Sequence, residues 1–258
     1  MNRYFIFFQY DGTAYHGWQL QPNAHSVQAE LQKALSTLLR TECEVVGAGR
    51  TDAGVHASKM VAHFDIEESL DGRQVAYRLN RMLPRDISVI DVVAVDNGMH
   101  ARFSASSRTY HYYIHTRKDP FLNAYSCLLH YRLDFEKMNE AGRLLTTYDD
   151  FGAFCKSHTD VKTTLCKVTE ARWESTGDHS YRFVITANRF LRNMVRAVVG
   201  TLVDVGRGRL SLDDFRAVVE SKRRTQAGES MPAHALFLHD IAYDGLSQAV
   251  SNKTEKER

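Results

Sequence analysis

The chain has 258 residues, of which 43% are hydrophobic and 25% charged, so it is long enough for one large domain or two small ones with a sizeable core. Its 33 basic and 31 acidic residues nearly cancel, which excludes a strongly basic or acidic protein. Four cysteines without a Cys-x-x-Cys pair argue against a disulfide scaffold and favour a reducing, cytoplasmic compartment. No apolar run reaches the roughly 18 residues of a membrane span, so we expect no membrane association.

Strands and helices alternate in the first part of the chain. Aromatic residues over 3–10 predict a buried strand that ends at the turn signal Asp11-Gly12. Ser26 is a suitable N-cap for the first helix, whose apolar residues recur at helical spacing. The expected strands are 3–10, 44–46, 59–66 and 86–95, and the expected helices are 26–40 and 73–81.

A second part is predicted to begin near residue 105, so the expected lobes are 1–105 and 106–247. Asp134 and Ser211 are suitable N-caps for two of its helices. The expected elements are strand 107–114, helix 134–145, a hairpin of 167–174 with 180–187 across residues 175–179, helices 189–205 and 212–223, and strand 235–243. Residues 248–258 are polar enough to form a tail without fixed structure. The chain is thus expected to be an α/β or α+β protein.

The stretch from Gly47 to Ala57 places Arg50 and Asp52 between glycines. It matches neither the phosphate-binding pattern G-x-x-x-x-G-K-[ST] nor the dinucleotide pattern G-x-G-x-x-G, and it lacks the alternating ligands of an EF-hand. Glycines allow the backbone to approach a ligand closely, and an arginine two residues away can keep a carboxylate ionised. The alternative is that Asp52 caps a turn and Arg50 lies on the surface.

Basic residues gather between Arg189 and Arg209, where five arginines accompany one acid, Asp204. On a helix over 189–205, Arg189, Arg192 and Arg196 would follow i, i+3, i+7 spacing and form one stripe. Such a stripe suits a nucleic-acid backbone, but it is also what an ordinary solvated helix face shows.

Several ordered blocks resemble the tRNA pseudouridine synthase A family. The main block is Gly49-Arg50-Thr51-Asp52-Ala53-Gly54-Val55-His56-Ala57, and the first is the run from Tyr10 to Gln19. The further blocks are Ser26-Val27-Gln28, Leu79-Asn80, Leu83-Pro84, Asp86-Ile87, the run from Ala101 to Ala105, the run from Arg108 to Tyr112, Asp150-Phe151, Met194-Val195-Arg196 with Gly200, and Pro232-Ala233-His234. The resemblance covers nearly all of residues 3 to 245, and the number and order of the blocks make it specific.

The resemblance implies a fold of two similar lobes whose mostly antiparallel sheets join around a central RNA-binding cleft, with helices on the outer face. It also implies a homodimer that converts uridine to pseudouridine at positions 38, 39 and 40 of the tRNA anticodon stem-loop. This isomerisation needs no organic cofactor and no metal. The sequence itself offers no strong metal site. Its histidines are scattered, and His111 and His115 lie on an expected strand, where i, i+4 spacing does not bring two side chains together.

The resemblance also assigns roles to single residues. Asp52 would be the catalytic aspartate, attacking ribose C1′ or removing the C2′ proton, and the sequence does not decide between these routes. Arg50 and Arg196 would pair with Asp52 or a phosphate, while Tyr110 would stack on the uracil and approach its C5 proton. Leu236 would line the uracil pocket. Without the resemblance, Tyr110 and Leu236 are typical core residues of strands.

Some residues depart from the family pattern and leave the exact uracil contacts open. Met60 replaces a frequent glutamine, Met231 and Ala235 replace alanine and glycine, and Phe237 replaces a frequent tyrosine. Two other functions are alternatives: an RNA-binding or chaperone protein that keeps the fold without catalysis, and a hydrolase that handles phosphate with the glycine loop. The absent P-loop lysine argues against the hydrolase.

Overall fold

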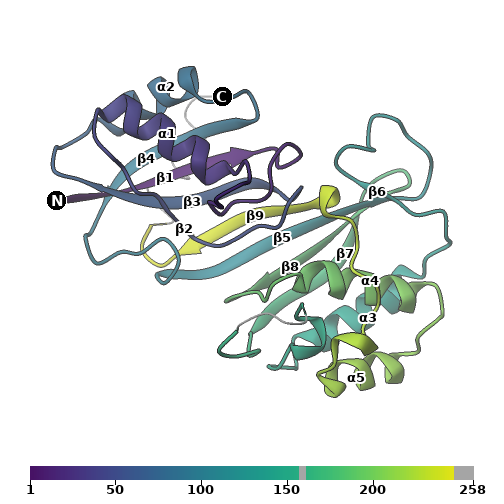
Figure 1. The fold of residues 1–258 in the computed structure, drawn as a ribbon. Coiled ribbons are helices and arrows are strands. Elements are labelled where there is room, and N and C mark those ends of the chain that lie inside the picture. Colours follow the sequence, from purple (N-terminus) through teal and green to yellow (C-terminus); the bar gives the residue numbers. More distant parts are fainter. Residues whose placement is uncertain (157–160, 247–258) are drawn as a thin grey trace. The chain divides into compact units, whose positions relative to one another are not determined.

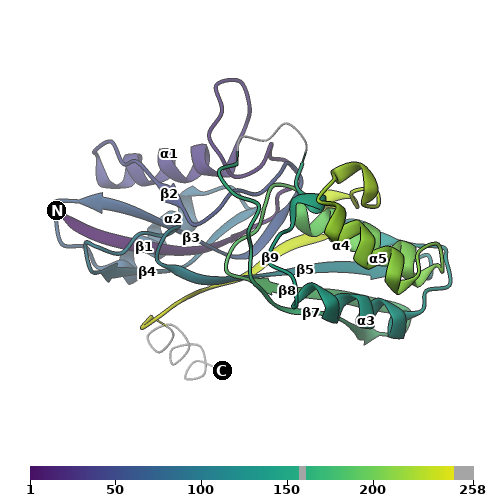
Figure 2. The same ribbon diagram turned by 90° about the horizontal axis from the view of Figure 1, so that it is seen from below.

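The computed structural model describes residues 1–156 and 161–246 (Figures 1 and 2). Over these residues strands and α-helices mix along the chain, which confirms the α/β class. Tertiary contacts define two compact units: unit 1 holds residues 1–108 and 238–246, and unit 2 holds residues 109–237. The polar tail predicted at 248–258 lies outside the described residues.

The strand order in unit 1 is β4-β1-β3-β9. Strand β1 (Asn2–Tyr10) pairs antiparallel on one side with β3 (His56–Ile66) and on the other with β4 (Ile87–Val95). Ile6 marks the register, because it lies opposite Ala62 of β3 and Val92 of β4. The last strand of the chain, β9 (Leu236–Tyr243), follows β3 in this order.

The core of unit 1 is centred on β1, which is buried without interruption from Tyr4 to Phe8. Successive side chains of a strand point to opposite faces, so unbroken burial means that both faces are covered. Aromatic contacts complete this core: the ring centroids of Phe8 and Trp18 lie 5.5 Å apart, and those of Phe5 and Tyr243 lie 5.1 Å apart.

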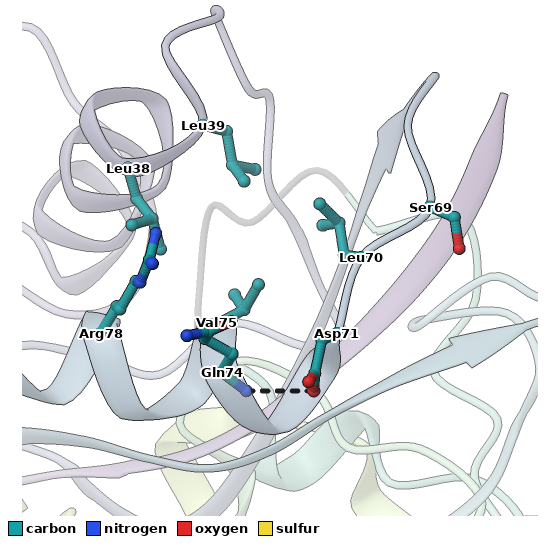
Figure 3. Close-up of a pocket in the computed structure, with 8 residues that line it drawn as sticks. All are labelled: Leu38, Leu39, Ser69, Leu70, Asp71, Gln74, Val75 and Arg78. Atoms are coloured by element: carbon teal, nitrogen blue, oxygen red, sulfur yellow. Dashed lines mark hydrogen bonds between the residues drawn. The ribbon is translucent and has the colours of Figure 1, made fainter.

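Two helices of unit 1 begin at residues that cap them. Helix α1 (Val27–Leu39) starts where Ser26 Oγ accepts a hydrogen bond from the amide of Ala29, at 3.3 Å. Helix α2 (Gly72–Met82) starts where Asp71 accepts from the amide of Gln74, at 3.2 Å (Figure 3). Both caps satisfy backbone donors that a helix start leaves without partners. Helix α2 packs against β4 and α1.

Unit 2 has the strand order β5-β8-β7, with β5 (Ala105–His115), β8 (Ser180–Ala187) and β7 (Val168–Gly177). Helices α3 (Phe135–Leu145), α4 (Met194–Gly206) and α5 (Leu212–Ser221) pack against one another, and α3 also packs on β7 (Figures 1 and 2). The remaining short elements are β2 (Val46–Gly47), β6 (Cys127–Leu128) and the 3-10 turns Gly152–Phe154, Arg224–Gln226 and Ala233–Ala235.

Four predicted elements differ from the structure. The strand expected at 59–66 is β3, which begins three residues earlier, at His56. The strand expected at 44–46 is β2, Val46–Gly47, which pairs with β3. The hairpin loop expected over 175–179 is only two residues long, because Gly177 of β7 already pairs with Ser180 of β8. The helix expected from residue 189 begins at Met194. Asn193 precedes it with a left-handed backbone, φ 65°, which no helix interior accepts.

The structure contains no helix that is long and apolar enough to span a membrane, within residues 1–156 and 161–246. All four cysteines are free and buried. Burial raises the pKa of each of their thiols, to about 11 for Cys166, so the thiols stay protonated and act as small apolar side chains in the core.

Candidate active site

Asp52 lies on the loop that joins β2 to β3 in unit 1. Antiparallel pairing of Val46 with His63 fixes the start of the loop, and His56 begins the strand that follows it. Along the loop, Arg50 is exposed, Thr51 is buried and Asp52 is half-buried. A half-buried carboxylate keeps contact with solvent and can still meet a ligand, so the position suits a reactive group.

The backbone on both sides of Asp52 is fixed by hydrogen bonds. The buried hydroxyls of Thr51 and Tyr10 lie 2.8 Å apart and share a hydrogen bond. The carbonyl oxygen of Thr51 accepts from the amide of Trp18 at 3.3 Å, and that of Tyr15 accepts from the amide of Gly54 at 3.3 Å. The segment 10–18 therefore lies beside the loop and holds it. This explains why two motifs far apart in the sequence form one structure.

Two glycines of segment 10–18 make this close approach feasible. A Cβ atom at Gly12 would lie 2.0 Å from the carbonyl oxygen of Val55, and one at Gly17 would lie 2.3 Å from that of Thr51. Gly17 also has φ +95°, a backbone conformation that L residues rarely adopt. Any side chain at either position would push the loop away. The glycines of the first family-like block thus serve the placement of Asp52.

A buried histidine at the start of β3 contacts the segment that lies beside the Asp52 loop. His56, 1% exposed, accepts a hydrogen bond from the amide of Gly12 at its Nδ1 atom, 3.0 Å away. The same Nδ1 lies 3.0 Å from a carboxylate oxygen of Asp11. These contacts tie the start of β3 to the turn after β1. Sequence reasoning did not assign His56 a role, although the residue belongs to the main family-like block.

In unit 2, Tyr110 and Tyr112 lie two residues apart on β5. Tyr110 is half-buried, and its ring meets that of Phe190 edge to face, with 5.0 Å between centroids. Tyr112 is fully buried and donates a hydrogen bond to the carbonyl oxygen of Pro232 at 2.9 Å. Burial raises the pKa of Tyr112 well above its usual value, so its hydroxyl stays protonated and donates.

Arg196 lies in the first turn of α4 and binds the segment that precedes β9. Its Nε donates to the carbonyl oxygen of Met231 at 2.5 Å, while the amide of Met231 donates to the carbonyl oxygen of Arg196 at 3.1 Å. A further hydrogen bond holds residues 228–232: the amide of Gly228 donates to the hydroxyl oxygen of Thr201 at 2.9 Å. Unit 2 therefore brings β5, the start of α4 and residues 228–236 together.

The predicted arginine stripe is wrong. Only Arg196 lies on α4; Arg189 and Arg192 precede the helix, because Asn193 interrupts it with its left-handed backbone. The three guanidinium groups therefore do not follow one helix face. Arg196 itself is half-buried and bound to Met231, which is not the environment of an ordinary solvated helix residue.

The remaining predicted residue, Leu236, begins β9 directly after the turn Ala233–Ala235 and is 6% exposed. Sequence reasoning missed the residues that fix this segment, Tyr112 and Met231. Tyr112 ends the family-like block from Arg108, but no role was assigned to it. Met231 was noted only as a departure from the family pattern, and its contacts with Arg196 are made by its backbone. Among the described residues, no group of three histidine, cysteine or acidic side chains is placed to hold a metal ion.

Fold and site together define a mixed α/β protein whose half-buried aspartate is presented on a glycine-shaped loop. Comparison with known proteins identifies the family. The family model described as tRNA pseudouridine synthase matches residues 6–104 and 145–244. The first range contains Arg50 and Asp52, and the second contains Arg196 and Leu236.

Relatives of known name agree with the family model. Proteins named tRNA pseudouridine synthase A are similar to this chain, with 57% identity in Bacteroides fragilis, over 94% of this chain and 97% of the relative. The relative from Bacteroides thetaiotaomicron is 56% identical over 94% of this chain and 91% of the relative. The relative from Bacillus subtilis is 41% identical over 91% of this chain and 96% of the relative. The chain therefore belongs to the tRNA pseudouridine synthase family, a class of isomerases that act on uridine in tRNA.

Proposed function

We propose that this isomerase converts uridine to pseudouridine at positions 38, 39 and 40 of the tRNA anticodon stem-loop, with Asp52 as its catalytic aspartate. The observation that supports the proposal most is the place of Asp52: half-buried, on a loop fixed on both sides by hydrogen bonds, inside a matched family range. A preorganised carboxylate of this kind is what the reaction needs, because the group must meet one sugar atom at a fixed distance.

The reaction changes the uracil atom through which the base is attached to the ribose, and it leaves the composition of the nucleotide unchanged. The bond between ribose C1′ and uracil N1 breaks, the base turns, and a bond forms between C1′ and C5. The C5 proton leaves and N1 gains a proton, so the product is an isomer of the substrate. The carboxylate of Asp52 either attacks C1′ or removes the C2′ proton, and both routes need it ionised.

The target nucleotide must leave its stack before a carboxylate can reach its sugar, which costs a few kcal/mol for a paired base and less near a loop. We assign Tyr110 the role of stacking on the extruded uracil and approaching its C5 proton. Arg50 and Arg196 pair with Asp52 or with the target phosphate, and Leu236 lines the uracil pocket. The half-burial of Tyr110 and the fixed backbone around Arg196 support these roles.

The lobe of residues 1–105 is proposed to supply the aspartate, and the lobe of residues 106–247 to supply Tyr110 and Arg196, to one uridine bound in a cleft. The family resemblance further suggests a homodimer in which one tRNA contacts both subunits. A tRNA substrate implies the cytoplasm, the compartment that the cysteine content also favours. These assignments rest on the resemblance and on substrate chemistry.

The test incubates purified protein with unmodified tRNA transcripts and maps pseudouridine at single-nucleotide resolution. We expect product at positions 38 to 40 with the wild type and with Asp178→Ala, a control that removes an exposed carboxylate from the β7–β8 turn. Asp52→Ala should abolish product while tRNA binding persists. Unchanged product with Asp52→Ala excludes the catalytic assignment, and RNA binding by a wild type that forms no product favours a non-catalytic RNA-binding protein.

A further inference from the structure

The outer face of α2 carries an unusual set of side chains. The helix buries Val75, Ala76 and Leu79. Its solvent side, on the opposite face, presents Arg73, Gln74, Tyr77, Arg78 and Arg81, all of them exposed. Arg85 follows three residues after the helix and is exposed as well. We call the set Arg73, Tyr77, Arg78, Arg81 and Arg85 the α2 basic face.

Among the described residues, no acidic side chain forms an ion pair with the α2 basic face, although Asp71 and Asp86 stand directly before and after residues 72–85. Between Gly72 and Arg85 the chain has four arginines and no aspartate or glutamate. The exposed helices of unit 2 differ: α3 mixes Glu136 and Glu140 with its basic residues, and α5 carries Asp213, Asp214 and Glu220. Most surface helices mix both signs in this way, because mixed charges avoid local repulsion. Solubility alone therefore does not explain a helix face whose charged side chains are all positive.

The four arginines are also not used to hold the fold. Other arginines form ion pairs, such as Arg3 with Asp65 at 2.7 Å and Arg172 with Glu170 at 2.7 Å. Within the part of the chain that the structure describes, none of the four on the α2 basic face forms an ion pair or a side-chain hydrogen bond. The one interaction that the face contains is internal: the Arg81 guanidinium lies 5.9 Å from the centre of the Tyr77 ring.

A small-molecule site does not account for the face. The cavity beside α2 has a volume of about 180 Å³, and Figure 3 shows Arg78 reaching from α2 toward Leu38 at the end of α1. Ligand pockets are usually larger, roughly 300–1,000 Å³. Of the four arginines, only Arg78 lines this cavity. A ligand held in a pocket therefore does not account for the α2 basic face.

We propose that the α2 basic face binds the sugar-phosphate backbone of the tRNA, away from the uridine that is modified. The proposal rests on the proposed function, which makes a polyanion the partner of this protein. Arg73 and Arg81 are separated by about 12 Å along the helix, a length over which a nucleic acid carries several phosphates. Tyr77, 63% exposed, lies between them and offers a hydroxyl donor to a phosphate.

The chemistry of the face determines what it does. Arginine side chains contact phosphates in every sequence alike, so the face adds affinity and orientation without reading bases. Each phosphate that is neutralised releases condensed counterions, and this release makes binding depend on salt. The α2 basic face should therefore contribute to the affinity for tRNA and to its salt dependence, while the turnover of bound tRNA depends on the Asp52 loop.

The test compares a triple variant and a double variant of the full chain with the wild type. Arg73→Gln with Arg78→Gln and Arg81→Gln removes three charges from the α2 basic face. Arg143→Gln with Arg216→Gln, exposed on α3 and α5, is the control and removes two charges elsewhere on the surface. The measurements are the Kd for an unmodified tRNA transcript over a range of KCl concentrations, and the single-turnover rate of pseudouridine formation at saturating tRNA.

The α2 variant should bind tRNA at least tenfold more weakly and lower the slope of log Kd against log [KCl] by about 1 for each lost phosphate contact. Its saturated rate should equal that of the wild type, and the control should keep both affinity and slope. A third variant with lysine at the three positions should restore the slope, because the charge is kept.

The inference can be overturned by either of two results. An α2 variant that unfolds at the wild-type temperature but keeps the wild-type Kd and slope overturns the inference, and so does an equal loss in the control. If the glutamine variant then fails to bind an acidic protein partner while tRNA binding is unchanged, the face serves that partner instead. A wild type that binds tRNA through this face but forms no pseudouridine leaves the inference standing and overturns the proposed function.

Discussion

Two segments, one in each unit, are held in different ways. The Asp52 loop of unit 1 is held mainly by backbone contacts, which glycines at positions 12 and 17 make feasible. The segment 228–232 of unit 2 is held mainly by side chains, which form hydrogen bonds with its backbone. These bonds join Arg196 to Met231, Tyr112 to Pro232 and Thr201 to Gly228. The difference teaches that the Asp52 loop is sensitive to added volume, whereas residues 228–232 are sensitive to the loss of side-chain hydrogen-bond partners.

The largest effect should come from added volume at the Asp52 loop. Gly12→Ala places a Cβ atom 2.0 Å from the carbonyl oxygen of Val55, so the loop must move. We expect a loss of about 2–3 kcal/mol of unfolding free energy and, because a small displacement of a catalytic group is costly, roughly 100-fold lower activity. Urea unfolding and pseudouridine formation on tRNA measure the two quantities.

Gly49→Ala is the control for stability. A Cβ atom at Gly49 would meet nothing within 4 Å, and its φ is not positive. Its unfolding free energy should stay within about 0.5 kcal/mol of the wild type. Equal destabilisation by both alanines would contradict the idea that close backbone approach holds the loop.

Acid should loosen unit 1 through His63, which pairs with Val46 at the start of the Asp52 loop. Burial, with a smaller contribution from Arg3, lowers the pKa of His63 to about 4. The unfolded chain, with a histidine pKa near 6.5, binds this proton more readily, so stability is present above about pH 6.5 and is lost as the pH falls toward 4. Between pH 7 and pH 5 the loss should be about 2 kcal/mol.

The measurement is urea unfolding at pH 7 and at pH 5, for the wild type and for His63→Gln. The variant cannot take up the proton, so its stability should depend less on pH, although it starts lower at pH 7 because the amide of Ala101 loses its partner at His63 Nδ1. Equal pH dependence of both proteins would show that His63 is not the group that titrates.

Lost donors should matter at residues 228–232. Arg196→Lys keeps the charge but removes the Nε donor that binds the carbonyl oxygen of Met231 at 2.5 Å. We expect kcat/KM to fall about tenfold, which corresponds to about 1.4 kcal/mol. Faster hydrogen exchange at the amide of Met231 should accompany the fall. Arg216→Lys on α5, where the guanidinium lies 3.8 Å from Asp213 on the surface, should change neither quantity.

The smallest effect should come from one neutral hydrogen bond. Tyr112→Phe keeps the buried ring and removes the hydroxyl that donates to Pro232, at a cost of about 1 kcal/mol in unfolding free energy. Tyr181→Phe is the matched control, because Tyr181 stacks on Phe135 at 3.9 Å through its ring alone. If thermal unfolding shows the same loss for both, the hydroxyl of Tyr112 does not hold the segment.

Local signals predicted most of the secondary structure. Ser26, Asp134 and Ser211 were predicted as N-caps, and each accepts the expected backbone hydrogen bond in the structure. The prediction failed at Arg189, where apolar spacing continued but the helix begins five residues later. The cause is the left-handed backbone of Asn193, whose side chain binds Ser230 at 2.5 Å, a partner 37 residues away. No local pattern contains that contact.

The sequence by itself determined the family blocks, the helix starts capped by Ser26, Asp134 and Ser211, and the glycine loop that presents Asp52, because each depends on residues close together in the chain. Only the tertiary structure decided what holds that loop and residues 228–232. Gly12 meets Val55, and Tyr112 meets Pro232, 120 residues further on. Such contacts form when the strands pack, and the residue types that make them are equally common in an ordinary core.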